Sequence, residues 1–331
     1  VICVTPTGLV PQAGPAAWTG ASLTPADWML PVGAEQAAEL AAAAQSGRRP
    51  ERAEDAPLPQ FAPLLQMVAE RLEHGRGFVL LRGLSPEQLG PQGAEAALLV
   101  LAAHLGTALA QDETGTLIGS LAGPTAGAEE PARFHADPAD VVALFCLRQP
   151  KEGGSVTLVS APALHNALLK SDRAALAVLH SPLPHRAVRR GPLAAPLEPD
   201  TEAPCMLPVF STASGAFVGR YDRQAMPDPL PEPAQVAALA ALDAAAAAPG
   251  QALSIPLHAG DLLLYNPQLV WKRAAAGEAR PAGEADRHLL RLWLATPLSR
   301  ALPESFRAVF GETAAGARRG GVPTADRMVG G

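Results

Sequence analysis

The sequence has few cysteines and no long apolar run, and each shortage excludes a class of protein. Cys3, Cys146 and Cys205 are odd in number and widely spaced, which fits neither a disulfide framework nor a zinc ribbon. Apolar runs stay below the roughly 18 residues that a membrane-spanning helix needs. The first residues also lack the basic stretch and apolar core of a signal peptide. We therefore expect a cytoplasmic protein without a membrane partner.

Basic charge is also scarce, and lysine most of all. The net charge is -6 at pH 7, so the chain lacks the basic footprint of proteins that bind nucleic acid or anionic membranes. The 26 basic residues include only three lysines, Lys151, Lys170 and Lys272. A lysine at a special position is therefore informative. With 48% hydrophobic residues in 331, the chain is long and apolar enough to bury a sizeable core, and a small molecule is the expected partner.

Helices and short strands alternate along the chain without an internal repeat. Alanine-rich or periodic apolar runs that end at glycine or proline predict helices, and short apolar runs between turn residues predict strands. The expected helices lie at 33–46, 64–74, 93–105, 163–179 and 231–248. The expected strands lie at 78–81, 141–147, 155–160, 209–210, 216–221, 252–257, 262–265, 269–273 and 289–294. This pattern indicates a mixed α+β protein with a jelly-roll core, the double-stranded β-helix, flanked by helices.

Proline-rich stretches suggest how the chain is organised. We expect an N-terminal extension, residues 1–57, whose helix packs on the core, followed by one jelly-roll domain at 58–325 and a tail at 326–331. A proline-rich segment, 181–208, interrupts the domain. Long connections of this kind often carry function, so this segment is a candidate lid.

A histidine and a carboxylate stand two residues apart just before a predicted core strand, in Phe134-His135-Ala136-Asp137. In an extended segment such side chains point the same way, so both could bind one metal ion. Non-haem iron enzymes use two histidines and one carboxylate on one face of the metal. The pair is a weak signal by itself, because a solvated loop gives the same pattern.

Several separated blocks strengthen this interpretation when they are taken in order. They are RGFVLLRGL from Arg76, AHLGT from Ala103, FHADPADVVALFCLRQPKEGGSVTLVS from Phe134, GDLLLYN from Gly260, RHLLRLWL from Arg287 and FGETAAGARRGG from Phe310. From Leu58 to Val322 the chain thus resembles the clavaminate synthase and taurine dioxygenase family of iron(II)/2-oxoglutarate oxygenases.

The resemblance implies a set of site residues. His135 and Asp137 match the first two iron ligands, Arg287 matches the arginine that binds 2-oxoglutarate, and Arg291 matches a second arginine that faces the substrate. Thr157 adjoins the place where relatives often carry a serine or threonine near the cosubstrate. The implied activity is hydroxylation or another oxidation of a small amino-acid-like metabolite, and a biosynthetic pathway is one setting for it.

The two arginines also point to an anion site without the resemblance. Arg287, Leu289, Arg291 and Trp293 alternate along one predicted strand, so both guanidinium groups would project from one apolar face. Buried unpaired cations are costly, and a planar guanidinium suits a carboxylate. The alternative is that Arg287 is a solvated strand end and that Arg291 pairs with a structural acid.

The chain departs from the family at the second histidine ligand, which lies in the strand after the Gly-Asp turn. An alignment without gaps between Asn266 and Arg287 puts Lys272 at this position, and a slip of one residue would put Trp271 there. An ammonium group cannot coordinate iron, and a lysine deprotonates only near its reference pKa of about 10.4. Beside Asp137, Lys272 would form an ion pair and occupy the place of the metal.

Other histidines are weaker candidates for the missing ligand. His258 precedes the Gly-Asp turn on a neighbouring strand, and Asp261 is expected to cap that turn. His165, at an expected helix start, matches a family position that has no metal role, and four others fit packing or surface roles: His104, His180, His185 and His288.

Two hypotheses follow from the sequence. In the first, the chain is an iron(II)/2-oxoglutarate-dependent oxygenase with an incomplete or altered metal site at His135 and Asp137. In the second, it is a degenerate member of the family in which Lys272 replaces the metal, and the cavity binds a ligand or performs metal-free chemistry, such as base catalysis or Schiff-base formation by a desolvated lysine. A Lys272 nitrogen within ion-pair distance of Asp137 would favour the second hypothesis, and an imidazole that converges on His135 and Asp137 would favour the first.

Overall fold

The fold is a mixed α+β structure with two sheets at its centre. The computed structural model describes residues 9–47, 49–90, 92–122, 133–149, 155–185, 205–228, 230–274 and 287–324. Most of the candidate lid and the whole tail at 326–331 lie outside these residues. None of the helices in this part of the chain has the length and apolar character to cross a bilayer.

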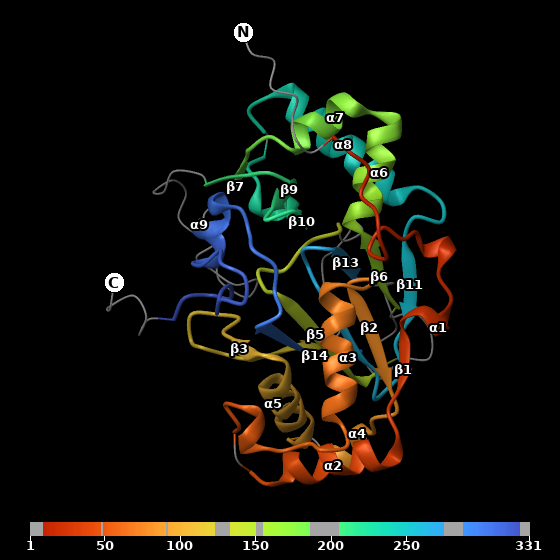
Figure 1. The fold of residues 1–331 in the computed structure, drawn as a ribbon, viewed down its shortest axis with the longest axis vertical. Helices are drawn as coiled ribbons and strands as arrows, with labels where there is room; N and C mark the ends of the chain where they lie inside the picture. The colour runs from red at the N-terminus through yellow and green to blue at the C-terminus, as the bar shows by residue number, and fades with distance from the viewer. Residues whose placement is uncertain are drawn as a thin grey trace.

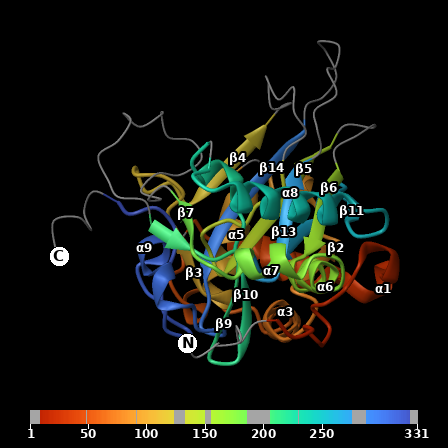
Figure 2. The same ribbon diagram turned by 90° about the horizontal axis from the view of Figure 1, so that it is seen from above.

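The helices of the described residues pack around the sheets (Figure 1). They are α1 Pro25–Trp28, α2 Ala34–Gln45, α3 Ala62–Glu73, α4 Pro86–Leu89, α5 Gly93–Leu105, α6 Ala161–Ser171, α7 Arg173–Leu179, α8 Pro233–Ala247 and α9 Arg307–Phe310. Helices α2, α4 and α5 lie together at the bottom of Figure 1, and α6, α7 and α8 lie together at the top; Figure 2 views this upper group from above. The predicted helix at 163–179 is two helices, because the side chain of Asp172 accepts a hydrogen bond from Ala175 N and begins α7.

The strands form one large sheet, one small sheet and two ribbons. Their bounds are β1 Met29–Pro31, β2 Phe78–Arg82, β3 Thr107–Leu109, β4 Ile118–Ala122, β5 Val141–Arg148, β6 Ser155–Ser160, β7 Leu183–His185, β8 Cys205–Leu207, β9 Phe210–Ala213, β10 Ala216–Gly219, β11 Leu253–Pro256, β12 Leu262–Tyr265, β13 Val270–Ala274 and β14 His288–Ala295. The large sheet has the order β1-β2-β12-β5-β14-β3, and β4 also pairs with β14. The small sheet has the order β11-β6-β13, and the ribbons are β7/β8 and β9/β10.

The core has two main layers, one on each face of the large sheet. Alternate residues of β14 divide between them: Leu289 and Trp293 join the cluster that also contains residues of the small sheet, whereas Leu290 and Leu292 join the cluster that packs on α2, α3 and α5. This alternation is the period-2 pattern of a sheet buried on both faces. It confirms the predicted jelly-roll core with flanking helices, and it places Arg291 on the interior face between the two sheets.

The turn before β12 fixes where that strand begins. Gly260 has φ +88°, and a Cβ at this position would lie 1.9 Å from the Leu84 carbonyl oxygen, so only glycine fits. Asp261 closes the turn by accepting a hydrogen bond from His258 N at 2.8 Å, and it forms a bidentate pair with Arg82. The turn thus sets the start of the strand that delivers Tyr265 to the interior.

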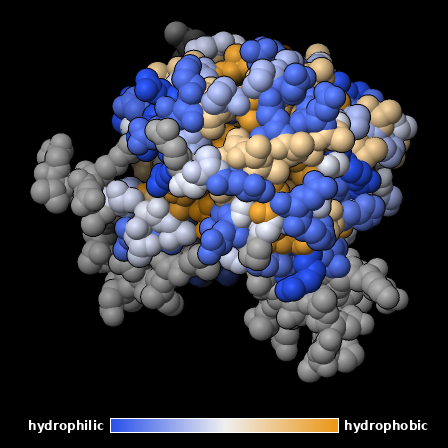
Figure 3. Space-filling view, turned by 90° about the horizontal axis from the view of Figure 1, so that it is seen from below, coloured by the Kyte–Doolittle hydropathy of each residue, from blue (hydrophilic) through white to orange (hydrophobic). Residues whose placement is uncertain are grey.

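Few large apolar side chains reach the surface. Among the described residues, those that are more than a third exposed are Val10, Met67, Met206, Val236 and Leu298. Figure 3 shows the face seen from below, where hydrophilic side chains separate the apolar ones.

Candidate functional site

The main chain of the His-x-Asp segment is fixed on two sides. His135 N donates to Lys272 O at 3.0 Å, and Lys272 N donates to His135 O at 3.1 Å, which makes an antiparallel β-bridge. Ala136 N donates to the Tyr221 carbonyl at 2.7 Å. Directly opposite residues in such a bridge project to the same face. Lys272 therefore shares a face with His135.

Asp137 is buried and already has partners. Tyr265 Oη donates to Asp137 Oδ2 at 2.8 Å, and Arg291 Nη1 lies 3.5 Å from Asp137 Oδ1. Burial alone would raise the pKa of this carboxyl, but attraction to Lys272, His135 and Arg291 and the Tyr265 hydrogen bond outweigh burial and lower the pKa to about 2. The carboxylate is thus ionised and held by hydroxyl and guanidinium donors.

Lys272 lies beside this carboxylate without pairing to it. Its side chain is 6% exposed, and in the described part of the chain no ion pair within 4.0 Å joins it to Asp137. The ion pair expected from the sequence is made by Arg291 instead. Burial lowers the pKa of Lys272, attraction to Asp137 opposes that change, and repulsion from Arg291 and Arg287 adds to it.

Arg291 is held in place by an amide side chain. Its Nε donates to Gln111 Oε1 at 2.7 Å, while Gln111 Nε2 donates to the carbonyls of Leu117 and Arg291, each at 2.7 Å. The guanidinium carbon also lies 4.7 Å from the centre of the Trp293 ring. The sequence left open whether Arg291 binds an anionic ligand or pairs with an acid of the protein. In the structure, Arg291 pairs with a buried acid, Asp137.

Arg287 has donor capacity to spare. Its Nε is buried and has no hydrogen-bond partner. Burial lowers the pKa of Arg287, and the neighbouring Cys146 thiol opposes that change. A β-bulge between His288 and Leu289 interrupts the strict alternation expected along this strand, yet both Arg287 and Arg291 act on Lys272. Both predicted arginines thus influence the charge of Lys272.

A third arginine near the cluster was not found from the sequence. Arg220 follows β10, is 2% exposed, and has no hydrogen-bond partner at Nε or Nη1. Burial lowers the pKa of Arg220, while Asp222, Cys205 and Asp137 oppose the change. Its carbon Cζ lies 5.7 Å from the centre of the Phe310 ring. No spacing signal marks this residue, because its neighbours come from distant segments.

Thr157 lies outside the cluster. It pairs across β6 with Arg273 of β13 and with Ser254 of β11, and Ser254 is exposed. Lys272 pairs with Leu158 instead, and successive residues of a strand point to opposite faces. The contact between Thr157 and a cosubstrate stays a prediction that these neighbours do not support.

The other histidines have partners of their own. His165 Nε2 and His180 Nε2 lie 3.1 Å apart, and His185 Nδ1 lies 2.9 Å from the Leu183 carbonyl. The main chain of His258 is tied into the Asp261 turn. Within the described ranges, no three side chains of His, Cys, Asp or Glu converge as a metal site would require.

The donor set at His135 and Asp137 does not fit an iron ion held by two histidines and a carboxylate. The side chain opposite His135 is an amine flanked by two guanidinium groups, and a protonated amine has no lone pair for a metal. Asp137 accepts from Tyr265 and faces Arg291. The described residues instead form a buried cluster of cations around one carboxylate, and this arrangement suits an organic anion.

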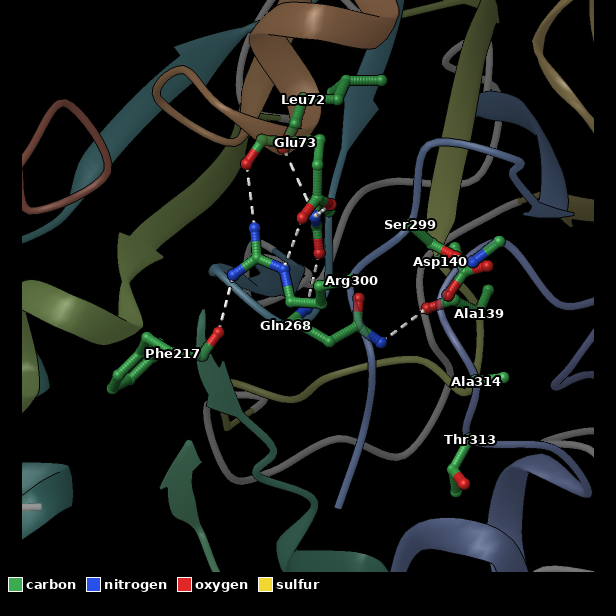
Figure 4. Close-up of polar contacts among 12 residues, drawn as sticks. Leu72, Glu73, Ala139, Asp140, Phe217, Gln268, Ser299, Arg300, Thr313 and Ala314 are labelled. Carbon is green, nitrogen blue, oxygen red and sulfur yellow. Dashed lines mark hydrogen bonds and ion pairs between the residues drawn. The ribbon is translucent and has the colours of Figure 1, made fainter. Parts of the chain in front are cut away.

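A buried polar network supports the loop that follows Asp137 (Figure 4). Gln268 Nε2 donates to the Ala139 carbonyl at 3.0 Å, and Arg319 Nε donates to Asp140 Oδ1 at 2.8 Å. In the same view, Arg300 donates to the Glu73 carboxylate at 2.8 Å and to the Glu73 carbonyl at 2.9 Å. The contacts of Gln268 and Arg319 thus hold the loop at Ala139 and Asp140.

Comparisons with known proteins agree with this architecture. Residues 42–293 match the model of the taurine catabolism dioxygenase TauD, TfdA family. Over 271 residues the chain is 29% identical to FR-33289 synthase of Streptomyces rubellomurinus (strain ATCC 31215), which covers 75% of this chain and 78% of that protein.

Solved structures show the same fold. Asparagine oxygenase in complex with iron(II), 2S,3S-3-hydroxyasparagine and succinate superposes with a TM-score of 0.64 at 23% identity, over 90% of this chain and 99% of that one. The non-haem iron oxygenase OrfP in complex with iron superposes with a TM-score of 0.61 at 17% identity, over 87% of this chain and 99% of that one.

Proposed function

Since the chain belongs to the taurine catabolism dioxygenase TauD, TfdA family, whose members bind iron(II) and 2-oxoglutarate, we propose that it binds a 2-oxo dicarboxylate of the 2-oxoglutarate class in its interior without the family's iron site. One observation carries the proposal: Lys272 occupies the place opposite His135, where the resemblance implies the second histidine ligand.

The charges around Lys272 support an anionic ligand. Arg287 and Arg291 both repel the charged form of Lys272, and Asp137 attracts Lys272 and Arg291. Buried cations without partners are costly, and an incoming carboxylate would remove that cost. Arg287 has an unpaired Nε, so we assign it to a ligand carboxylate, as the resemblance implies for 2-oxoglutarate. Arg291 is already held by Asp137 and Gln111, and in this proposal it positions Asp137.

The second ligand in this proposal is a small amino-acid-like molecule. Both solved relatives contain iron, and the asparagine oxygenase also contains hydroxyasparagine and succinate; those ligands are properties of those proteins. In this chain Arg220 offers two unpaired guanidinium nitrogens near Asp137, which suit an α-carboxylate.

The family favours a second candidate, iron(II)/2-oxoglutarate-dependent oxidation of such a metabolite. This function needs at least one further donor beside His135 and Asp137, and no described His, Cys, Asp or Glu supplies it. The observation that supports this candidate is the similarity to FR-33289 synthase over most of both chains.

An anaerobic titration separates the two candidates. The full chain, stripped of metal, is titrated with 2-oxoglutarate by calorimetry and then with iron(II), while the visible charge-transfer band of an iron–oxo-acid chelate is followed. We expect 2-oxoglutarate to bind without iron and no band to form.

Two variants make the titration decisive. Lys272→His restores an imidazole and is expected to gain the band, whereas Lys272→Met, which lacks both the charge and a ligand, is not. A band at stoichiometric iron in the unmodified chain would contradict the proposal and establish the oxygenase candidate.

A further inference from the structure

We propose that Lys272 forms an imine with the keto carbon of a 2-oxo acid bound in the interior, an inference that rests on the binding function proposed above. The reaction would be metal-free and would use the side chain that stands opposite His135. Lys272 stands where the family has a histidine ligand, and this reaction gives it a covalent role.

The first support is the position of the amine. The Lys272 side chain is 6% exposed, and within the described part of the chain its nitrogen has neither an ion pair nor a hydrogen bond, since Arg291 and Tyr265 are the groups that hold Asp137. The Lys272 main chain is fixed by the bridge to His135 and by the pairing of β13 with β6. The amine is thus delivered to the interior on a rigid strand and left available.

The second support is the electrostatic neighbourhood. A lysine attacks a carbonyl only in its neutral form, and desolvation or a nearby cation favours that form. The Lys272 side chain is buried, and the neighbouring carboxylate of Asp137 already has Tyr265 and Arg291 as its partners.

The third support is an anchor for the acid. Arg287 directly precedes β14, the strand that carries Arg291, and it has a buried Nε without a partner. A 2-oxo acid carries a carboxylate and a ketone in one small molecule. A carboxylate held by Arg287 would therefore keep the keto carbon in the neighbourhood of the amine, which raises its effective concentration.

The chemistry balances without a co-reactant. The nitrogen lone pair forms a C–N bond to the keto carbon, and the electrons of the C=O π bond move to oxygen, which takes up a proton. The carbinolamine then breaks its C–O bond and releases water, while nitrogen gives up the protons that oxygen has taken. The sum is amine plus ketone to imine plus water, with no oxidant or reductant.

Trapping with borohydride tests the inference on the full chain. The protein is incubated with 2-oxoglutarate and a metal chelator, reduced with borohydride, and analysed by intact mass and peptide mapping. Because the chain has three lysines, the modified position can be assigned directly. We expect one reduced adduct per chain, on the peptide that contains Lys272.

Matched variants serve as controls. Lys272→Met should lose the adduct, Lys170→Met should keep it because Lys170 is exposed at the end of α6, and Arg287→Gln should reduce trapping at least tenfold while Lys272 remains present. The Arg287 variant keeps the test informative if Lys272→Met folds poorly.

The outcomes separate this inference from the binding proposal. Calorimetric binding of 2-oxoglutarate without an adduct on Lys272 overturns the imine and leaves the binding function standing. Adducts spread equally over all lysines overturn it too, since they report non-specific chemistry. If 2-oxoglutarate does not bind at all, both proposals fail together.

Discussion

At the scale of single residues, the cluster surrounds one buried carboxylate, that of Asp137, with a hydroxyl donor and cationic side chains. The sequence predicted Lys272, Arg287 and Arg291 as neighbours of His135 and Asp137, because strand alternation and motif order are local signals. It did not predict Tyr265 or Gln111. Tyr265 lies 128 positions from Asp137 and Gln111 lies 180 from Arg291, and no local pattern encodes contacts over such separations.

We predict that removal of the buried Lys272 amine makes the folded protein more stable. Lys272→Met keeps the length of the side chain and leaves Asp137 its contacts with Tyr265 and Arg291. Replacement of a buried polar or ionic group by a well-packed apolar side chain is often stabilising, so we expect the free energy of unfolding to rise by about 1 kcal/mol. Urea unfolding measures this. A loss of stability would show that Lys272 holds the fold together.

We predict that removal of the Tyr265 hydroxyl has the opposite effect and makes the folded protein less stable. Tyr265→Phe removes the donor to Asp137 Oδ2 and leaves a buried carboxylate oxygen unpaired, at a cost of about 1–3 kcal/mol. Tyr221→Phe is the control, because Tyr221 donates to Asp243, which is only partly buried. Equal losses in the two variants would argue against a special role for Asp137.

At the scale of elements, long apolar runs were predictable and short strands were not. β5, β6, β12 and β14 coincide with the expected strands. β1, β3, β7 and β8 have three residues each, and they become strands only because a distant partner supplies their hydrogen bonds. The prediction therefore found the strands that carry the core and missed those that close its edges.

We predict that the protein loses stability in acid because of a histidine contact between helix α6 and the end of helix α7. His180, after α7, shares a contact with His165 of α6, and burial together with His165 lowers the pKa of His180 from 6.5 to about 4. A lowered histidine pKa means that the unfolded chain binds the proton more readily. The stabilising effect is complete above pH 6.5 and is lost as the pH falls toward 4, by at most about 3 kcal/mol.

Urea unfolding at pH 7.5 and pH 4.5 tests this, with His180→Asn as the control. The variant should show a smaller difference between the two pH values. The same difference in both proteins would place the acid sensitivity elsewhere, for example at His185, whose pKa burial also lowers to about 4.

At the scale of the whole molecule, the C-terminal segment holds the loop that carries Asp137. Arg319 is 2% exposed, donates to Asp140, and also donates to the carbonyls of Thr313 and Ala314. The sequence marked this segment only as a family block. Its contact with a loop 179 positions earlier comes from the fold.

Loss of this contact should damage both stability and binding. Arg319→Ala leaves Asp140 buried without its ion-pair partner, at a cost of about 3–5 kcal/mol, and we expect weaker binding of 2-oxoglutarate as the loop loosens. Arg318→Ala is the matched control, because Arg318 is exposed. Thermal unfolding and calorimetry measure the two effects, and equal melting temperatures for the two variants would contradict the assignment.

The packing of α2 bears on domain organisation. Leu40 and Ala44 join the same core cluster as Leu65 of α3 and Leu98 of α5. We propose that residues 1–57 are an extension that packs on a single domain at 58–325, so that the two parts unfold together.

The bridge between His135 and Lys272 is made by main-chain atoms alone, so its hydrogen bonds tolerate any side chain at position 272 except proline, which lacks the N–H. Evolution can therefore exchange the reactive group at this position while the strand register is inherited unchanged. One replacement at position 272 can thus change the chemistry of the site without changing the strand pairing. Chains descended from a common ancestor with this bridge are expected to differ in chemistry at this position before they differ in fold.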